Sequence, residues 1–258
     1  MVPIRQLPSV WEFSSFAERG SSSGVTTVET QRQKMERVKR EFLSKNLKMY
    51  RLVIGYFLID ALFQSSLAMD VSKNFKHVTC GSILKLRNMR QNVRLHSHDV
   101  KYGSGSGQQS VTGTEQIEDH NSYWTVRGKH QGHCNRGEPV KCGEVIRLQH
   151  LSTKRNLHSH LFQSPISRNQ EVSAFGENGN GDTGDNWEVV CKSKKWKRDE
   201  KIKFKHTDTG MYLQATGEQY GRPIAGQREI VGAHYGDDPG CLWIASEGVY
   251  VSSEKKKR

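Results

Sequence analysis

The chain has 258 residues, of which 34% are hydrophobic and 26% are charged. This composition excludes a disulfide miniprotein, a disordered tail and a fibre, and a mean hydropathy of -0.73 excludes a polytopic membrane protein. The formal net charge is +12, but beyond residue 77 the cations are mixed with many acidic residues, so we expect no nucleic-acid partner. All 11 His and all 5 Cys lie beyond residue 76, which divides the chain into two parts.

The first part has the pattern of a targeting segment. Leu52–Phe63 is an apolar run that follows several cations and precedes the small residues Ser66 and Ala68. Because the run is shorter than the ~20 apolar residues that span a bilayer, and contains Asp60, we expect no stable membrane insertion. The pattern predicts a signal peptide-like segment at residues 49–68, after a disordered or upstream extension at residues 1–48. A buried helix of a small N-terminal domain is the alternative.

In the second part the same landmarks return three times. Cys80–Leu86 is matched by Cys142–Leu148, and the Leu-His-Ser-His sequence at residues 95–98 returns at residues 157–160, both at a spacing of 62 residues. A more divergent third copy has Leu213-Gln-Ala-Thr216 in the corresponding place. Each unit ends on a tryptophan, namely Trp124, Trp187 and Trp243. This order predicts three related structural repeats.

Within each unit apolar residues alternate with polar ones and Gly-rich loops lie between them, as expected of short strands. One unit alone could not bury its apolar face, so the pattern predicts an all-β fold, a β-trefoil over residues 78–251. The repeats would span residues 78–134, 135–191 and 192–251, with a basic tail at 252–258. An open solenoid is the alternative, and it is disfavoured because it would leave strand edges unprotected.

Two His-x-His pairs place imidazoles on one side of a strand and are candidate polar pockets for sugars. The candidate ligand-binding residues are Arg94, His96, His98, Gln108, Gln109, His158, His160 and Gln170. The third repeat has Gln214 and Thr216 instead, so its pocket is expected to be lost. The alternative is purely structural, with one His of each pair donating a hydrogen bond to a carbonyl. A metal site is not expected, because no Cys, Asp or Glu was found to recur at a fixed spacing.

The cysteines are plausible disulfide partners if the chain enters an oxidising compartment. Cys80 with Cys134, and Cys142 with Cys191, would bracket the first two repeats, and Cys241 would remain free. No Cys-x-x-Cys pair supports a zinc ribbon or thioredoxin chemistry.

Residues 192–203 hold seven cations around Trp196. We expect this run either to dock an acidic partner surface or to form a solvated linker between repeats. The candidate partner-binding residues are Lys194, Lys195, Lys197 and Arg198. No nucleophile elbow, P-loop or His-Glu-x-x-His motif is present, so no catalytic residue, enzyme activity or cofactor is expected.

The repeats resemble MIR motifs, the β-trefoil module of protein O-mannosyltransferases and of inositol trisphosphate and ryanodine receptors. Leu95–Val100, Tyr102–Thr112 and Gly217–Pro223 are similar, within that family, to stromal cell-derived factor 2 and its like-1 paralogue. The resemblance implies a non-enzymatic protein of the endoplasmic-reticulum lumen. It also implies work in quality control with a J-domain co-chaperone, the lumenal chaperone BiP, and unfolded or O-mannosylated clients. A carbohydrate-binding module for mannose-bearing proteins is the alternative function.

The end of the sequence differs from that family. Its members commonly carry an HDEL-like retrieval tetrapeptide, whereas this sequence ends Glu254-Lys-Lys-Lys-Arg258. Lumenal retention would then depend on a partner, and secretion is the alternative.

Overall fold

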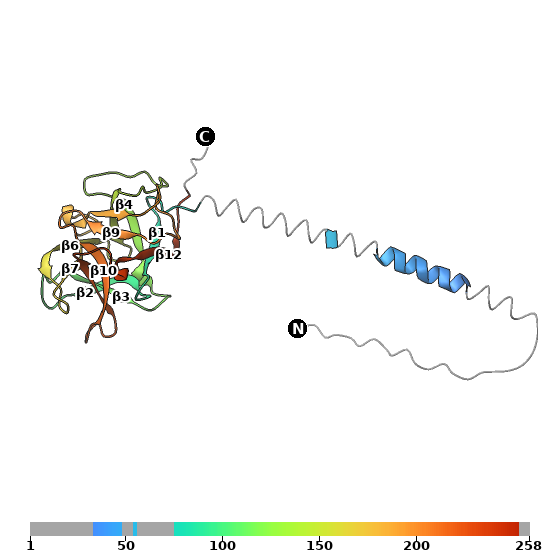
Figure 1. The fold of residues 1–258 in the computed structure, drawn as a ribbon, viewed down its shortest axis with the longest axis horizontal. Coiled ribbons are helices and arrows are strands. Elements are labelled where there is room, and N and C mark those ends of the chain that lie inside the picture. The colour runs from blue at the N-terminus through green and yellow to red at the C-terminus, as the bar shows by residue number, and fades with distance from the viewer. Residues whose placement is uncertain (1–32, 48–53, 56–74, 253–258) are drawn as a thin grey trace, which may run out of the picture. The chain divides into compact units, whose positions relative to one another are not determined.

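The computed structural model describes residues 33–47, 54–55 and 75–252 (Figure 1). The chain divides into two units, Met1–Ser66 and Leu67–Arg258. In the first unit, residues 33–47 form a helix whose side chains are almost all exposed, with ion pairs such as Arg37 to Glu41. No helix in the described residues is both long and apolar enough to cross a membrane. Apart from residues 54–55, the signal peptide-like segment expected at 49–68 lies outside the described residues, as do 253–258 of the basic tail.

The second unit consists of short strands and 3-10 turns. The described residues contain the strands β1 (Ile83–Asn88), β2 (Arg94–Lys101), β3 (Gln109–Thr114), β4 (Trp124–Gly128), β5 (Val145–His150), β6 (Asn156–Gln163), β7 (Gln170–Phe175), β8 (Trp187–Val190), β9 (Lys203–His206), β10 (Tyr212–Gln219), β11 (Arg228–Ala233) and β12 (Trp243–Val249). A 3-10 turn precedes the last strand of each repeat: η1 (His120–Ser122), η2 (Thr183–Asp185) and η3 (Pro239–Cys241).

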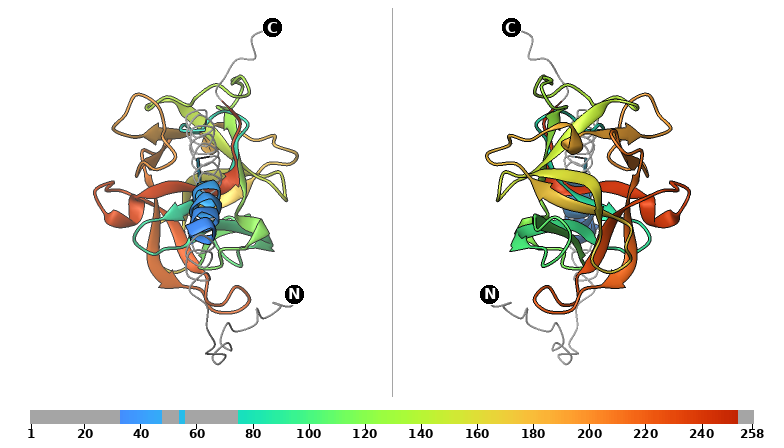
Figure 2. Two further views of the ribbon diagram at one scale, coloured as in Figure 1. Left: turned by 90° about the vertical axis from the view of Figure 1, so that its right-hand side faces the viewer. Right: turned by 90° about the vertical axis from the view of Figure 1, so that its left-hand side faces the viewer.

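Six strands close a barrel and the other six form three hairpins. The barrel runs through β1, β4, β5, β8 and β9, and it closes through β12, which pairs with β1 and meets the start of β9 in the bridge between Ile202 and Trp243. The hairpins β2–β3, β6–β7 and β10–β11 also pair with one another, through β3, β7 and β11. Figure 2 shows the hairpins in green, yellow and orange-red from two opposite sides. This arrangement is a β-trefoil, so the predicted fold is confirmed.

The recurring leucine and tryptophan of each repeat are partners in the core. Trp124, Trp187 and Trp243 are fully buried. Their indole Nε1 atoms donate to the carbonyl oxygens of Leu95, Leu157 and Leu213 at 2.8, 2.9 and 2.9 Å. Each tryptophan thus contributes apolar surface to the core and also satisfies a backbone carbonyl where a hairpin begins.

Three segments meet in a ring at one end of the barrel. Val78 N donates to Trp196 O, Trp196 N to Val140 O, and Val140 N to Val78 O, at 2.9, 2.9 and 3.0 Å. All three side chains are buried. Trp196 therefore takes the place in the third repeat that valine has in the first two.

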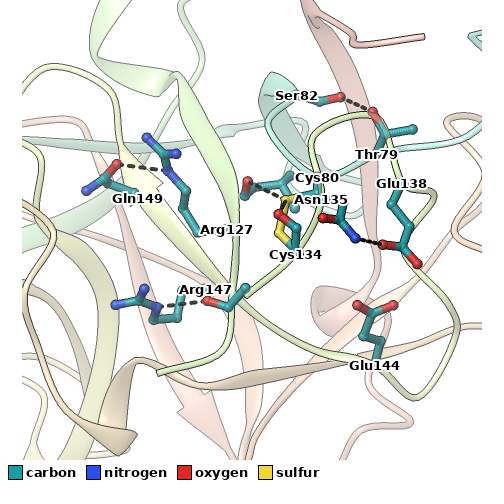
Figure 3. Close-up of a disulfide and its surroundings, with 12 residues drawn as sticks. Thr79, Cys80, Ser82, Arg127, Cys134, Asn135, Glu138, Glu144, Arg147 and Gln149 are labelled. Atoms are coloured by element: carbon teal, nitrogen blue, oxygen red, sulfur yellow. Dashed lines mark hydrogen bonds between the residues drawn. A yellow bond between two sulfur atoms is a disulfide. The ribbon is translucent and has the colours of Figure 1, made fainter. Parts of the chain in front are cut away.

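The repeats are closed in two different ways near this ring. Disulfides join Cys80 to Cys134 and Cys142 to Cys191, the pairs expected from the sequence (Figure 3 shows one of them). Cys241 is free and buried. In the third repeat Arg198 occupies the position of Cys142, and its guanidinium lies 3.8 Å from the ring centre of Tyr250. The third repeat therefore has a cation–π contact at the position where the first two repeats have a disulfide.

Candidate functional site

The histidine pairs lie in the middle of β2 and β6, where each strand passes from the core to the surface. The serine between the histidines points the other way and is buried: Ser97 Oγ donates to Ser110 O and Ser159 Oγ to Glu171 O. This alternation places both histidines of a pair on one side of the strand, as predicted. The ring centroids are 4.8 Å apart for His96 and His98, and 5.0 Å apart for His158 and His160.

In the first repeat one carboxylate and two imidazoles form a chain. His96 Nδ1 lies 2.7 Å from Asp119 Oδ2, and His96 Nε2 lies 2.5 Å from His98 Nδ1. A carboxylate only accepts, so His96 donates at Nδ1 and accepts from His98 at Nε2. His98 Nε2 is left as a hydrogen-bond acceptor at the half-buried end of the chain.

Burial and neighbouring groups shift the pKa values of His98 and Asp119 in this hydrogen-bonded chain. Burial, and then the neighbouring His96, lower the pKa of His98. Burial works to raise the pKa of Asp119, but hydrogen bonds from Ser122 and His96 outweigh it and leave that pKa lowered. The pocket of the first repeat therefore contains one fixed anion and a half-buried imidazole that stays neutral near pH 7.

In the second repeat each histidine has its own carboxylate. His158 Nδ1 lies 3.0 Å from Asp185 Oδ1 and 3.6 Å from Asp182 Oδ1. His160 Nε2 lies 3.2 Å from Glu171 Oε1, and both Asp185 and Glu171 are fully buried. Gly184 closes over this site, since a Cβ there would lie 2.5 Å from a ring carbon of His158. Two nearly identical sequences thus form different hydrogen-bond networks.

The third repeat keeps the backbone of the site without its histidines. Thr216 Oγ1 donates to Glu229 Oε2 at 3.2 Å, and Asp238 forms an ion pair with Arg90 of the first repeat at 3.0 Å. No imidazole replaces His160 at this place in the described trefoil. The histidine pocket is absent from this repeat.

The carboxylates are the residues that the sequence analysis missed. Asp119, Asp182 and Asp238 cap the 3-10 turns and each lies five residues before the tryptophan that ends its repeat. The statement that no Asp recurs at a fixed spacing was therefore wrong. The pattern Asp-x-x-x-x-Trp would have revealed it. The structural alternative was also wrong in detail, because His96 and His158 donate to carboxylates and not to carbonyls.

Two of the three candidate glutamines form hydrogen bonds away from the histidines. Gln109 Nε2 donates to Ser97 Oγ and Thr153 Oγ1, and Gln170 Nε2 donates to Ser159 Oγ and Thr209 Oγ1. Gln108 Oε1 accepts from Ser173 Oγ. Gln109 and Gln170 therefore join hairpin strands to neighbouring turns, so their placement in the histidine pockets was wrong, whereas Gln108 binds a serine of β7 and its role in a pocket stays a prediction.

Arg94 forms an ion pair with a glutamate of β12. Its Nη2 is 2.8 Å from Glu247 Oε1, and the Arg94 side chain is almost completely buried. Burial acts to raise the pKa of Glu247, but the hydrogen bond from Arg94 and other bonds lower it to about 2. Arg94 therefore joins the first repeat to the third, and its part in a ligand pocket stays a prediction.

Three side chains of the second repeat could hold a metal ion. One donor atom from each of His158, Asp182 and Asp185 lies within 4.8 Å of the other two. Both carboxylates of this cluster already accept hydrogen bonds, Asp182 from Gly184 N and Asp185 from Asn156 Nδ2. The arrangement satisfies these groups internally, which agrees with a structural carboxylate–histidine pair.

The basic run is a folded turn. Glu200 accepts from the backbone N–H groups of Lys192 and Ser193 at 2.9 and 3.0 Å. Lys194 and Lys195 are exposed and Lys197 is half-buried. Arg198 is half-buried and is stacked on Tyr250, so it also helps to close the third repeat.

Comparisons with known proteins agree with this architecture. A profile of the MIR domain matches residues 90–244. Stromal cell-derived factor 2 of Homo sapiens is 58% identical over 174 residues, which cover 67% of this chain and 82% of the human protein. The crystal structure of the SDF2-like protein from Arabidopsis thaliana has a TM-score of 0.67 and 45% identity, covering 69% of this chain and 99% of that one.

A more distant structure shares the fold. The S. cerevisiae protein O-mannosyltransferase Pmt1-Pmt2 complex, solved bound to the sugar donor, matches with a TM-score of 0.61 and 26% identity. The match covers 71% of this chain and 28% of that chain.

Fold, repeat and profile together define a MIR-domain β-trefoil. The identity and coverage go further, and the chain belongs to the stromal cell-derived factor 2 family.

Proposed function

We propose that this protein is a non-enzymatic component of a chaperone complex in the endoplasmic-reticulum lumen. There it binds a J-domain co-chaperone together with a BiP-type chaperone, and holds unfolded or O-mannosylated clients during quality control. The observation that carries the proposal is the identity of 55–58% to stromal cell-derived factor 2 and its like-1 paralogue in mammals.

Two features of the structure support this proposal. The disulfides Cys80–Cys134 and Cys142–Cys191 suit an oxidising compartment. Three of the four histidines are engaged by carboxylates and His98 by His96, and no serine or cysteine nucleophile lies in hydrogen-bond contact with these imidazoles in the described trefoil. A binding role therefore fits the site better than nucleophilic catalysis.

The test is direct binding of the purified full-length chain to a purified lumenal J-domain protein and to BiP. We expect the chain to bind the J-domain protein and to enter a ternary complex with BiP. A variant with His98→Ala and His160→Ala should bind equally well if the pockets are structural. Absence of binding to both chaperones, with a folded chain, would contradict the proposal.

Carbohydrate recognition is a second candidate for the pocket of the second repeat. The Phe162 ring lies 4.7 Å from that of His160 and is half exposed. An exposed aromatic ring beside an imidazole and the exposed carboxylate of Asp182 is a combination that can stack on a sugar and bind its hydroxyls.

The lectin hypothesis has a matched control within one strand. Phe162→Ala should abolish binding of a mannosylated peptide, measured by calorimetry, whereas Leu161→Ala should not, because Leu161 is exposed on the opposite side of the strand. Equal effects of the two changes, or no binding by the unaltered chain, would count against recognition here.

A further inference from the structure

The ring end of the barrel carries an unusual arrangement of positive charge. Lys141 and Lys195 lie directly opposite each other in an antiparallel bridge, and His77 lies opposite Lys197. Like charges opposite each other on paired strands destabilise a fold. No lysine among Lys76, Lys141, Lys194, Lys195 and Lys197 forms an ion pair with an acidic residue of the described chain. We call these five lysines the ring-end patch.

Three acids near the patch are engaged by other groups. Glu200 accepts from Lys192 N and Ser193 N, and Glu144 accepts from Lys141 N. Glu138 accepts from Asn135 Nδ2 at 3.1 Å (Figure 3). These hydrogen bonds engage the three acids, and no acid of the described residues lies within ion-pair distance of a lysine of the ring-end patch.

The electrostatics at His77 agree with this geometry. Burial lowers the pKa of His77 first, and the cations of Lys195, Lys76 and Lys197 lower it further. Three lysines from two distant segments thus act on one imidazole.

A surface pocket adjoins the patch. It has a volume of about 700 Å³ and shares Lys76 with the ring-end patch. Phe75, Ile244 and Ala245 give it an apolar wall, and Arg87 and Arg198 add cations. Of its two acids, Glu247 already pairs with Arg94. A ligand that carries a negative charge next to an apolar group would be complementary to these cations and this apolar wall.

We propose that the ring-end patch and this pocket form a docking surface for an acidic polypeptide segment of a partner protein. Carboxylates would lie over the lysines, and an apolar side chain would fill the pocket. Protein fits better than single-stranded nucleic acid, because Trp196, the aromatic residue within the basic run, is fully buried and offers no face on which a base could stack. The proposal concerns the partner's chemistry and does not depend on which chaperone it is.

The experiment uses a synthetic peptide rich in Asp and Glu with one central Leu, titrated against the full-length chain. Reversing the patch with Lys194→Glu, Lys195→Glu and Lys197→Glu should weaken binding at least about tenfold at low salt, and high salt should reduce the difference. The matched control is Lys101→Glu, Lys154→Glu and Arg168→Glu, which changes the net charge equally at exposed sites elsewhere. It should bind almost as the unaltered chain does.

A second readout separates binding from folding. Lys195→Glu alone replaces a like-charge pair with an opposite-charge pair to Lys141, so it should raise the melting temperature while weakening the peptide complex. A lowered melting temperature, or equal binding by patch and control variants, would overturn the proposal. So would preferential binding of an oligonucleotide or of vesicles containing phosphatidylserine. If the peptide binds at the patch and no J-domain protein binds the chain, the surface stands and the proposed function falls.

Discussion

At the scale of single residues, the tryptophan that ends each repeat has two roles. It fills the core, and its indole N–H satisfies the leucine carbonyl at the start of a hairpin. We expect Trp187→Phe to cost about 2 kcal/mol or more of unfolding free energy, because a buried carbonyl loses its donor and the smaller ring leaves a void. Urea unfolding measures this cost. Tyr235→Phe, at an exposed ring, should change it by less than about 0.5 kcal/mol.

Residues that recur at one spacing could be predicted from the sequence, and residues that meet only through folding could not. The leucines and tryptophans keep a fixed order, so their shared role follows from the repeat. The acid that pairs with the first histidine is 23 residues further along the chain for His96 but 27 for His158. The second repeat thus uses a different position of the 3-10 turn. The spacing between repeats therefore does not identify the acid that pairs with each histidine.

At the scale of elements, the last residue of one barrel strand in each repeat binds the turn of a neighbouring repeat. Asn88 Nδ2 donates to Gly240 O at 2.7 Å, His150 Nε2 to Asn121 O at 2.9 Å, and His206 Nε2 to Gly184 O at 2.8 Å. Two repeats therefore use a titratable side chain where the first uses an amide.

This difference predicts acid sensitivity. Burial lowers the pKa of His150 to about 4 and also lowers that of His206. The unfolded chain then binds more protons than the folded one between about pH 6.5 and 4, so stability is complete above this window and falls as the pH falls through it. For His150 the loss is about 3 kcal/mol. His150→Asn with His206→Asn, which copies the amide of Asn88 into the other two repeats, should flatten the fall of melting temperature over this window. An unchanged pH profile would contradict the assignment.

The three closures of the repeats should differ in strength. Cys142→Ser with Cys191→Ser should cost about 4 kcal/mol, because the bridge closes a loop with a separation of 49 residues in the unfolded chain. Arg198→Ala, which removes the stacking on Tyr250 and a long hydrogen bond to Phe75 O, should cost about 1–2 kcal/mol. Chemical unfolding under non-reducing conditions compares them. An Arg198 change as costly as loss of the disulfide would show that the third closure is more than a cation–π contact.

The strands could be predicted from the sequence, but the hydrogen-bond partners of their side chains could not. Alternating apolar residues and Gly-rich loops specify the hairpins, since one face of each strand must be buried. The glutamines adjoin the histidine strand in the hairpin, which suggested a shared pocket. They instead point to the turns of the next repeat, where Thr153 and Thr209 accept their hydrogen bonds.

At the scale of the whole trefoil, no repeat has a complete set of neighbours of its own. Every hairpin pairs with the other two, and the barrel closes only when β12 meets β1. We expect residues 75–252 to unfold in one transition with coincident circular dichroism and tryptophan fluorescence. A fragment of residues 135–191 should remain unfolded. A folded fragment, or two separate transitions, would contradict this cooperativity.

The overall fold could be predicted from the sequence because a threefold repeat of half-buried strands has few ways to protect its edges. Partner docking could not be assigned to particular lysines in the same way. The basic run is contiguous in the chain, but Lys141 and His77 join it only through the ring of Val78, Val140 and Trp196.

The two ends of the trefoil also meet beside that ring. Thr79 Oγ1 donates to Val251 O at 2.7 Å, and Val251 N donates to Ser82 Oγ at 3.1 Å. The order of the repeats along the chain is therefore only one of several that the same architecture would accept. A circularly permuted protein, joined across this seam by a short linker and opened in the exposed loop at residues 103–105, should keep the fold.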